Sequence, residues 1–376
     1  MPLLEKFSVA RQLKSGLEQA GHDPTGVVFD SLNSATEGVV EGRTTILAGT
    51  NNYLGLTFDP ECISAGKVAM DSLGTGTTGS RMANGSYAAH RLLESDLADF
   101  YRFDNAMVFS TGYAANLGVL TALLGKGDAV LLDSDAHASL YDGCGMSGAD
   151  IYRFKHNDVT SLERRLARLG DRASNCLIVV EGMYSVLGDC APLAEFVEIK
   201  ERYGAMLLVD EAHSLGVYGK NGCGLAEEQG VLDRVDFVVG TFSKSLGAMG
   251  GFCASPHDVL GLFRYVSRPF MFTASPGPSV MATTREALRK LRTQPELRDR
   301  LWSNARHLNS GLQDLGLEHG PEGSPVVAVK CKDRESGLAD WHRLREAGVY
   351  VNMMLPPAPP GGARFLRGSC SAAHTP

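Results

Sequence analysis

The chain has 376 residues, of which 44% are hydrophobic and 21% are charged, and its formal net charge is −7. At about 150 residues per domain, this length predicts two or three domains with ample core. The acidic balance, without a basic stripe, excludes a nucleic-acid-binding protein, and no apolar run reaches the roughly 18 residues that a membrane-spanning helix needs.

The N-terminal segment mixes charged with apolar positions, so we expect no signal peptide. The 8 cysteines are scattered, with no C-x-x-C pair and no histidines at zinc spacing. We therefore expect a cytoplasmic protein with reduced thiols, no metal site and no integral membrane contact.

Apolar runs typical of buried strands alternate with helical patterns along most of the chain. The predicted strands are 106–110, 128–137, 176–182, 205–213 and 235–244. The predicted helices between them are 114–125, 161–170 and 191–204. Because strands that are apolar throughout are covered on both faces, the pattern predicts an α/β fold with a mainly parallel central sheet and flanking helices.

The pattern changes after Pro276 and Pro278, where a long helical segment begins. Beyond it we predict a helix and short extended segments, at 338–348 and at 324–331, 349–354 and 364–369. The predicted organisation is an N-terminal arm, a large domain and a smaller C-terminal α+β domain, with the bounds 1–50, 51–275 and 276–376.

Polar residues lie at or just beyond the C-terminal ends of several of the predicted strands. They are His137, Glu181 with Ser185, Asp210 with His213, and Lys244. In an open parallel sheet the carboxyl ends of the strands meet at one crevice, where ligands bind. A single residue of this kind is more often structural or solvated. Because such residues occur at the ends of several separate strands, the pattern favours a ligand-binding site.

Lys244 is the one charged residue in "GTFSKSLGAMGGF", residues 240–252. Burial would lower the pKa of its amine below about 10.4, and a neutral amine can condense with an aldehyde. Pyridoxal 5′-phosphate (PLP) requires such a lysine, together with a carboxylate for its ring nitrogen and donors for its phosphate. Asp210 is the candidate carboxylate, His213 could reach the phenolic oxygen or the substrate carboxylate, and His137 could lie flat on the ring.

A phosphate site is predicted at "STGYAANLG", residues 110–118, where a strand-to-helix turn would direct backbone N–H groups at an anion. Thr241 and Ser243 add hydroxyl groups near the lysine.

Two other motifs resemble nucleotide-binding sites. "GTGTTG" at 74–79 matches a dinucleotide fingerprint but follows a helical pattern, and "GTFSKS" lacks the glycines of a P-loop. We therefore expect neither a Rossmann site nor a nucleoside triphosphatase.

The motifs "NNYLGL", "SRMANGSYAAHRLLE", "DSDAHASLYDG", "EGMYSVLGD", "VDEAHSLGVYG" and "GTFSKSLGAMGGF" resemble those of the α-oxoamine synthases. These fold type I, aminotransferase-like PLP enzymes join an amino acid to an acyl thioester with loss of carbon dioxide. The resemblance covers nearly the whole chain. Within the family, "GTGTTGSRMANG" and "RPFMFTAS" are most similar to the soluble bacterial serine palmitoyltransferases.

The resemblance implies a homodimer with shared active sites that condenses L-serine with a long-chain acyl-CoA. It implies Lys244 as the Schiff-base lysine and proton shuttle, with Arg367 on the amino-acid carboxylate. The other implied cofactor and substrate contacts are Asp210 on the ring nitrogen, His213 and Ser185 near the phenolic oxygen, His137 on the ring and substrate, Gly112, Tyr113, Thr241 and Ser243 around the phosphate, Thr273 at the phosphate of the other subunit, and Asn52 at the substrate.

Three positions depart from the serine-using pattern. Asn51 replaces an expected aromatic residue, Gly368 stands where a cysteine is usual, and the chain ends at "GSCSAAHTP" where the family continues into a last helix. The chain is therefore either truncated or a variant with a reduced second domain. A sibling synthase that uses glycine or alanine, and a homologue that binds PLP without catalysis, stay open as alternatives.

Overall fold

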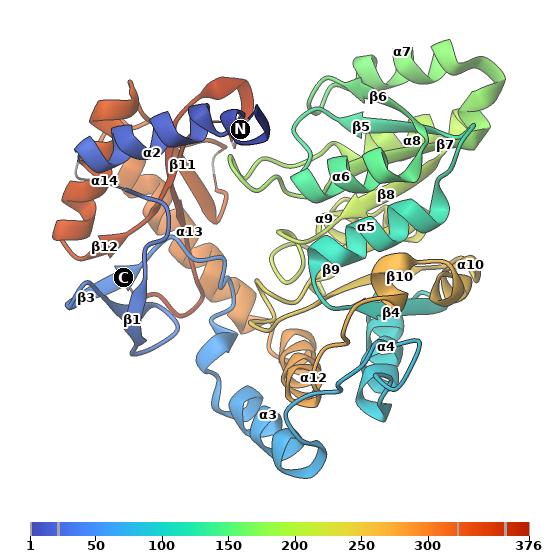
Figure 1. Ribbon diagram of the computed structural model, residues 1–376, viewed down its shortest axis with the longest axis horizontal. Coiled ribbons are helices and arrows are strands. Elements are labelled where there is room, and N and C mark those ends of the chain that lie inside the picture. Colours follow the sequence, from blue (N-terminus) through green and yellow to red (C-terminus); the bar gives the residue numbers. More distant parts are fainter. Residues whose placement is uncertain (1, 21–22, 322, 357–358, 376) are drawn as a thin grey trace.

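The computed structural model describes residues 2–20, 23–321, 323–356 and 359–375. A seven-stranded sheet lies in its larger part, in the order β4-β10-β9-β8-β7-β5-β6 (Figure 1). β10 is antiparallel to both neighbours, and the other pairings are parallel. The bounds are β4 Asn105–Phe109, β5 Ala129–Asp133, β6 Asp150–Phe154, β7 Cys176–Glu181, β8 Met206–Asp210, β9 Phe237–Thr241 and β10 Gly251–Ser255. The prediction of a mainly parallel sheet is confirmed.

Helices cover both faces of this sheet, and the strands send alternate side chains to the two sides. On β5, Leu131 packs into one apolar core, while Val130 and Leu132 pack into the other. The helices on the first side are α4 Ala88–Tyr101, α7 Val159–Leu169 and α8 Leu193–Tyr203. Those on the second are α5 Gly112–Leu123 and α6 Ala138–Ser147. Burial on both faces explains why the strands are apolar throughout.

Segments from the two ends of the chain lie together, apart from the large sheet (Figure 1). β1 to β3 form an antiparallel meander, and β12 pairs in parallel with β3 through Val349 opposite Ile46. Their bounds are β1 Phe29–Leu32, β2 Glu37–Val40, β3 Arg43–Leu47 and β12 Val349–Tyr350. This sheet joins parts of the first and last predicted domains, whose boundaries stay a prediction.

A second small sheet, in the order β11-β14-β13, lies in the same part of the molecule. Leu17 and Trp341 share a separate apolar cluster that packs α2 against α14. The bounds are β11 Val326–Lys330, β13 Asn352–Met354, β14 Phe365–Ser369, α1 Pro2–Glu5, α2 Ser8–Ala20 and α14 Arg334–Glu346. The predicted C-terminal helix and extended segments are therefore present.

The loop at 74–79 follows a helix, as predicted. That helix, α3 Pro60–Leu73, has Pro60 in its first turn and is capped by the carboxylate of Asp59, so the loop lacks the context of a dinucleotide fingerprint. The long helix predicted after Pro278 is instead two helices, because Pro295 has no N–H to continue the first. They are α12 Pro278–Thr293 and α13 Glu296–Asp314.

Shorter helices complete the fold: α9 Leu225–Glu228, α10 Val259–Leu262 and α11 Arg268–Met271. Within the described ranges, none of the helices has both the length and the apolar character required to cross a bilayer.

Candidate active site

The carboxyl ends of β4, β5, β7, β8 and β9 surround a cavity of about 320 Å³. The predicted site residues that line it are Gly112, Tyr113, His137, Asp210, His213, Thr241, Ser243 and Lys244. These residues come from separate strand ends and the segments that follow them. The sheet therefore brings together side chains that are far apart in the sequence.

Lys244 follows β9 and contributes its amine to this cavity. Burial of the amine lowers its pKa from 10.5 to about 8, although the negative charges of Asp210 and Glu181 oppose this shift. Near neutral pH, a useful fraction of the amine is therefore unprotonated and nucleophilic.

Asp210 is buried at the end of β8 and is held by two donors. Its Oδ1 accepts from the backbone N–H of Ala212 at 2.9 Å, and its Oδ2 accepts from the amide of Asn116 at 2.7 Å. Asn116 also donates to the hydroxyl of Ser139 at 2.9 Å, and that hydroxyl lies 2.8 Å from Nδ1 of His137. A continuous hydrogen-bond chain thus fixes the carboxylate and the histidine relative to each other.

His213 is buried and contacts Tyr53, whose hydroxyl lies 2.8 Å from Nδ1 of the ring. Burial and the nearby charge of Lys244 lower the pKa of His213 well below its ordinary value, so the ring is neutral. Burial raises the pKa of Tyr53, which therefore keeps its proton. The hydrogen bond between the tyrosine hydroxyl and Nδ1 therefore joins two neutral groups, and its direction depends on which ring nitrogen carries the proton.

Glu181 lies at the end of β7 and accepts from the backbone N–H of His137 at 2.6 Å. Burial and the charge of Asp210 raise its pKa well above the ordinary value. Its strand-end position was noticed in the sequence, but no role followed from it. Asn116 and Ser139 were not predicted at all, although both line the cavity.

The N-terminus of α5 borders the same cavity. Thr111 caps the helix by accepting from the N–H of Ala114 at 3.0 Å. Gly112 is packed so closely that a Cβ there would lie 2.9 Å from Cβ of Thr241. The hydroxyl oxygens of Thr241 and Ser243 lie 2.9 Å apart and form a hydrogen bond. Glycine thus permits the helix N-terminus and two hydroxyls to converge, an arrangement suited to an anion.

Ser185 lines an adjoining cleft of about 1060 Å³, which shares His137 with the lysine cavity. Arg367 is buried and donates to the carbonyl of Ser185 at 2.7 Å and to the amide oxygen of Asn51 at 3.0 Å. Asn52 instead donates to the carbonyl of Ala35 and the hydroxyl of Thr57, at 3.3 and 2.7 Å. The adjacent Asn51, rather than Asn52, contacts the predicted carboxylate-binding arginine.

Thr273 lies in the partly exposed bend that follows α11, outside the lining of the lysine cavity. Its expected place at the cofactor phosphate of another subunit stays a prediction.

A family model described as aminotransferase class I and II matches residues 43–376. The chain belongs to the aminotransferase class I and II family. Among its relatives is a serine palmitoyltransferase from Caulobacter vibrioides, 54% identical over 375 residues, which span 100% of this chain and 93% of that protein. An 8-amino-7-oxononanoate synthase from Symbiobacterium thermophilum is 39% identical over 337 residues, 90% of this chain and 86% of that one.

A solved structure of serine palmitoyltransferase with its PLP internal aldimine has a TM-score of 0.97 and 49% sequence identity, and the match covers 100% of this chain and 94% of that chain. The expected fold type I, aminotransferase-like architecture is confirmed. Within the class I and II aminotransferase family, the resemblance to the α-oxoamine synthases is confirmed as well.

Proposed function

We propose that this protein catalyses the PLP-dependent decarboxylative condensation of L-serine with a long-chain acyl-CoA, palmitoyl-CoA, to 3-ketodihydrosphingosine, the first step of sphingolipid synthesis. The observation that carries this proposal is the convergence of Lys244, Asp210 and His137 on one cavity. The 54% identity to a serine palmitoyltransferase over the whole chain supports the choice of substrates.

The residues of the cavity fit PLP. A lysine with a pKa of about 8 suits the aldehyde, and the buried carboxylate of Asp210 suits a protonated ring nitrogen. Glycine at position 112 lets the N-terminus of α5 pack directly against Thr241, because a Cβ there would lie 2.9 Å from Cβ of Thr241, and the two hydroxyls and the helix N-terminus can therefore contact one phosphate. Gly112, Tyr113, Thr241 and Ser243 would hold the phosphate. When bound, PLP supplies an aldehyde for the lysine and a ring that withdraws electrons from the substrate α-carbon.

The side chains of the protein have separate tasks in this reaction. The Lys244 amine, unprotonated in part near neutral pH, takes the α-proton of the amino acid and returns it later. Asn116 and Ala212 hold the Asp210 carboxylate in place. Its negative charge is therefore already oriented to stabilise the positive charge that a protonated ring nitrogen of the cofactor would carry. His137, oriented through Ser139, positions the substrate over the cofactor face.

Arg367 would bind the carboxylate of the amino acid. Its guanidinium is already oriented by Ser185 and Asn51, so little side-chain freedom is lost on binding. The adjoining cleft would hold the acyl thioester, since it shares His137 with the lysine cavity. Asn52 has its amide engaged by Ala35 and Thr57, which favours an indirect role for it in substrate binding.

We further propose a cytoplasmic homodimer in which Thr273 of one subunit completes the phosphate site of the other. Its bend is partly exposed and lies outside its own subunit's cavity. The large domain at 51–275 would carry most of each site, with Arg367 supplied by the smaller domain.

A sibling synthase that uses glycine or alanine is the second candidate. The observation that favours it is Asn51, because asparagine at this position is more typical of the other branches and contacts Arg367. The 8-amino-7-oxononanoate synthase at 39% identity is a relative of that kind.

The deciding measurement is kcat/KM for serine, glycine and alanine with palmitoyl-CoA, with the product identified by mass. We expect serine to be preferred by a modest factor, because a pocket that accepts a hydroxymethyl group does not necessarily require it. The same series in Asn51→Tyr tests whether this position sets the preference. A higher value for glycine or alanine would reject the serine assignment, and the absence of any product would favour the non-catalytic alternative.

A further inference from the structure

Glu181, the last residue of β7, is a buried carboxyl group that has no task in the proposed reaction. It is 3% exposed and lines the same cavity as Lys244. Glu181 lies opposite Asp210 in the parallel pairing of β7 with β8, so the two carboxyl groups end neighbouring strands at one edge of the sheet. Because burial of an ionisable side chain costs free energy, its presence in this cavity indicates a function.

Glu181 holds the backbone of His137. Its Oε1 accepts from the N–H of His137 at 2.6 Å, although the two residues are 44 positions apart in the chain. His137 caps the N-terminus of α6, where its Nδ1 accepts from the N–H of Ser139 at 3.2 Å. The histidine is therefore held at two points, its backbone by Glu181 and its ring by Ser139, and the direction of the ring depends on both.

The same hydrogen-bond network reaches the carboxylate of Asp210. Ser139 and Asn116 connect the ring of His137 to Asp210 through contacts of 2.8, 2.9 and 2.7 Å. Since Glu181 and Asp210 occupy paired positions in the sheet, these contacts form a closed ring. A closed ring is stiffer than a chain with one free end, so the loss of the contact at Glu181 would alter the position of His137.

The surroundings of Glu181 suppress its charge. Two donors, the N–H of Ala212 and the amide of Asn116, stabilise the anionic form of Asp210. Burial and the negative charge of Asp210 raise the pKa of Glu181 well above its ordinary value. Near neutral pH, Glu181 is therefore a neutral acid whose carbonyl oxygen accepts from His137. It orients the histidine without competing with Asp210 for the positive charge of the cofactor ring.

We propose that Glu181 is a positioning residue, which holds His137 against the face of the cofactor and so sets the affinity for the amino acid. This inference rests on the proposed function, because it takes His137 as the residue that lies over the cofactor and the substrate. Glu181 acts through the backbone of His137 rather than through a charge of its own. A glutamine should therefore replace it, and a leucine of similar size should not.

The first test is the Kd of the PLP-loaded protein for L-serine, measured by the change in cofactor absorbance without acyl-CoA. Glu181→Gln should stay within about threefold of the unmodified protein, since its amide oxygen can accept from the same N–H. Glu181→Leu should raise the Kd by about tenfold, because a displaced histidine makes poorer contacts with the substrate. In both variants the Kd for PLP should change by less than about threefold, because the proposed cofactor contacts are retained.

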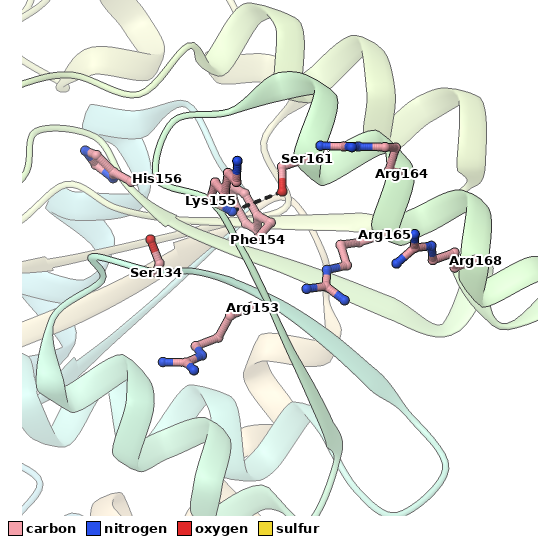
Figure 2. Close-up of a pocket in the computed structure, with 9 residues that line it drawn as sticks. All are labelled: Ser134, Arg153, Phe154, Lys155, His156, Ser161, Arg164, Arg165 and Arg168. Atoms are coloured by element: carbon pink, nitrogen blue, oxygen red, sulfur yellow. Dashed lines mark hydrogen bonds between the residues drawn. The ribbon is translucent and has the colours of Figure 1, made fainter. Parts of the chain in front are cut away.

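Ser161→Ala is the matched control. The Ser161 hydroxyl accepts from the backbone N–H of Lys155 at 3.1 Å, and this contact joins the segment after β6 to α7 (Figure 2). The substitution therefore also removes a side-chain acceptor from a backbone N–H, but outside the lining of the lysine cavity. It should leave the Kd for serine within about twofold, whatever its effect on denaturant unfolding of the cofactor-free protein.

A purely structural role for Glu181 would give the pattern of this control, with stability lost and the Kd for serine unchanged. That result in Glu181→Leu would overturn the proposal. A glutamine variant that binds serine as weakly as the leucine variant would also overturn it, because the role would then belong to the charge of Glu181. If the leucine variant does not fold, the glutamine variant decides, since retained affinity supports the proposal and a tenfold loss contradicts it.

A second readout needs neither cofactor nor substrate. In cofactor-free protein labelled with ¹⁵N at histidine, the amide signal of His137 can be assigned by its loss in His137→Asn. This signal should move in Glu181→Leu and stay close to its place in Glu181→Gln, because the hydrogen bond sets the shift of the amide proton. An unmoved signal in Glu181→Leu would overturn the proposal. If the signal moves as expected but the unmodified protein binds no serine, the proposed function fails while the hold of Glu181 on His137 stands.

Discussion

The hydroxyl of Tyr53 lies 2.8 Å from Nδ1 of His213, although the two residues are 160 positions apart in the chain. This contact connects the segment after β3 to the end of β8 and gives Nδ1 of the buried histidine a hydrogen-bond partner.

Tyr53→Phe should destabilise the protein by about 1–3 kcal/mol, because it leaves the buried Nδ1 of His213 without its hydrogen-bond partner. Denaturant unfolding of the cofactor-free protein measures this change. Tyr265→Phe is the control, since Tyr265 is 75% exposed. Equal stability of the two variants would show that the hydrogen bond contributes nothing to folding.

Lys244→Ala should abolish turnover and remove the visible absorbance of the covalently bound cofactor, because Lys244 is the one lysine among the described residues that line that cavity. Absorbance spectra after incubation with PLP, together with product analysis, measure both effects. Lys126→Ala, in an exposed loop, should change neither. Turnover by Lys244→Ala would contradict the assignment of this lysine.

The rate at which cofactor-free protein forms the covalent complex with PLP should rise with pH up to about 8 and then level off. The sign follows from the lowered pKa of Lys244, about 8 instead of 10.5, since only the neutral amine reacts. Stopped-flow absorbance gives the rate. A lysine with an ordinary pKa would instead accelerate by about tenfold per pH unit up to about 10.4, and that profile would refute the expectation.

Asp210→Asn should still bind PLP but lose most exchange of the substrate α-proton, since a neutral amide cannot hold the positive charge of the ring nitrogen. Exchange of the α-hydrogen of serine in deuterated water, followed by NMR, measures this step. Asp142→Asn is a useful comparison, because the Asp142 carboxylate accepts a hydrogen bond from Tyr113, whereas the carboxylate that Asn116 holds is that of Asp210. Equal exchange rates in the Asp210 variant and the unmodified protein would contradict the assignment of Asp210 to the ring nitrogen.

Mixing Lys244→Ala with Thr273→Asp, each inactive alone, should restore activity when subunits exchange. The heterodimer has one site with an intact lysine and an intact partner threonine, so up to about a quarter of all sites become competent in an equal mixture. Lys244→Ala mixed with His137→Ala is the control, because both changes damage the site of their own subunit. No recovery in the first mixture, despite exchange shown by mass, would argue against shared sites.

The strand ends could be predicted because an apolar run marks a buried strand and the first polar residue marks its end. Lys244, Asp210 and His137 were found in this way. The residues that support them could not be found from the sequence. Asn116, for example, lies within a helical pattern that gives no sign of function, and its partner Asp210 is 94 residues away in the chain. The contact of Asn51 with Arg367 spans 316 residues and depends on how the chain ends meet.

Two strands of the large sheet were also missed. In β6, "DIYRF" carries charged residues among the apolar ones, because an edge strand is partly exposed. The segment "GFCAS" of β10 is short and follows the loop that carries Lys244. Its antiparallel pairing with β4 and β9 depends on distant residues, so the local sequence does not indicate it.

The pairing of β3 with β12 has a consequence for synthesis of the protein on the ribosome. Ile46 emerges about 300 residues before Val349, its partner in the sheet. At roughly 5–20 residues per second, the edge of the N-terminal meander stays open for about 15–60 seconds. During that interval the unpaired backbone groups of β3 are available to other chains, so the meander is open to mispairing until the C-terminal segment has been made.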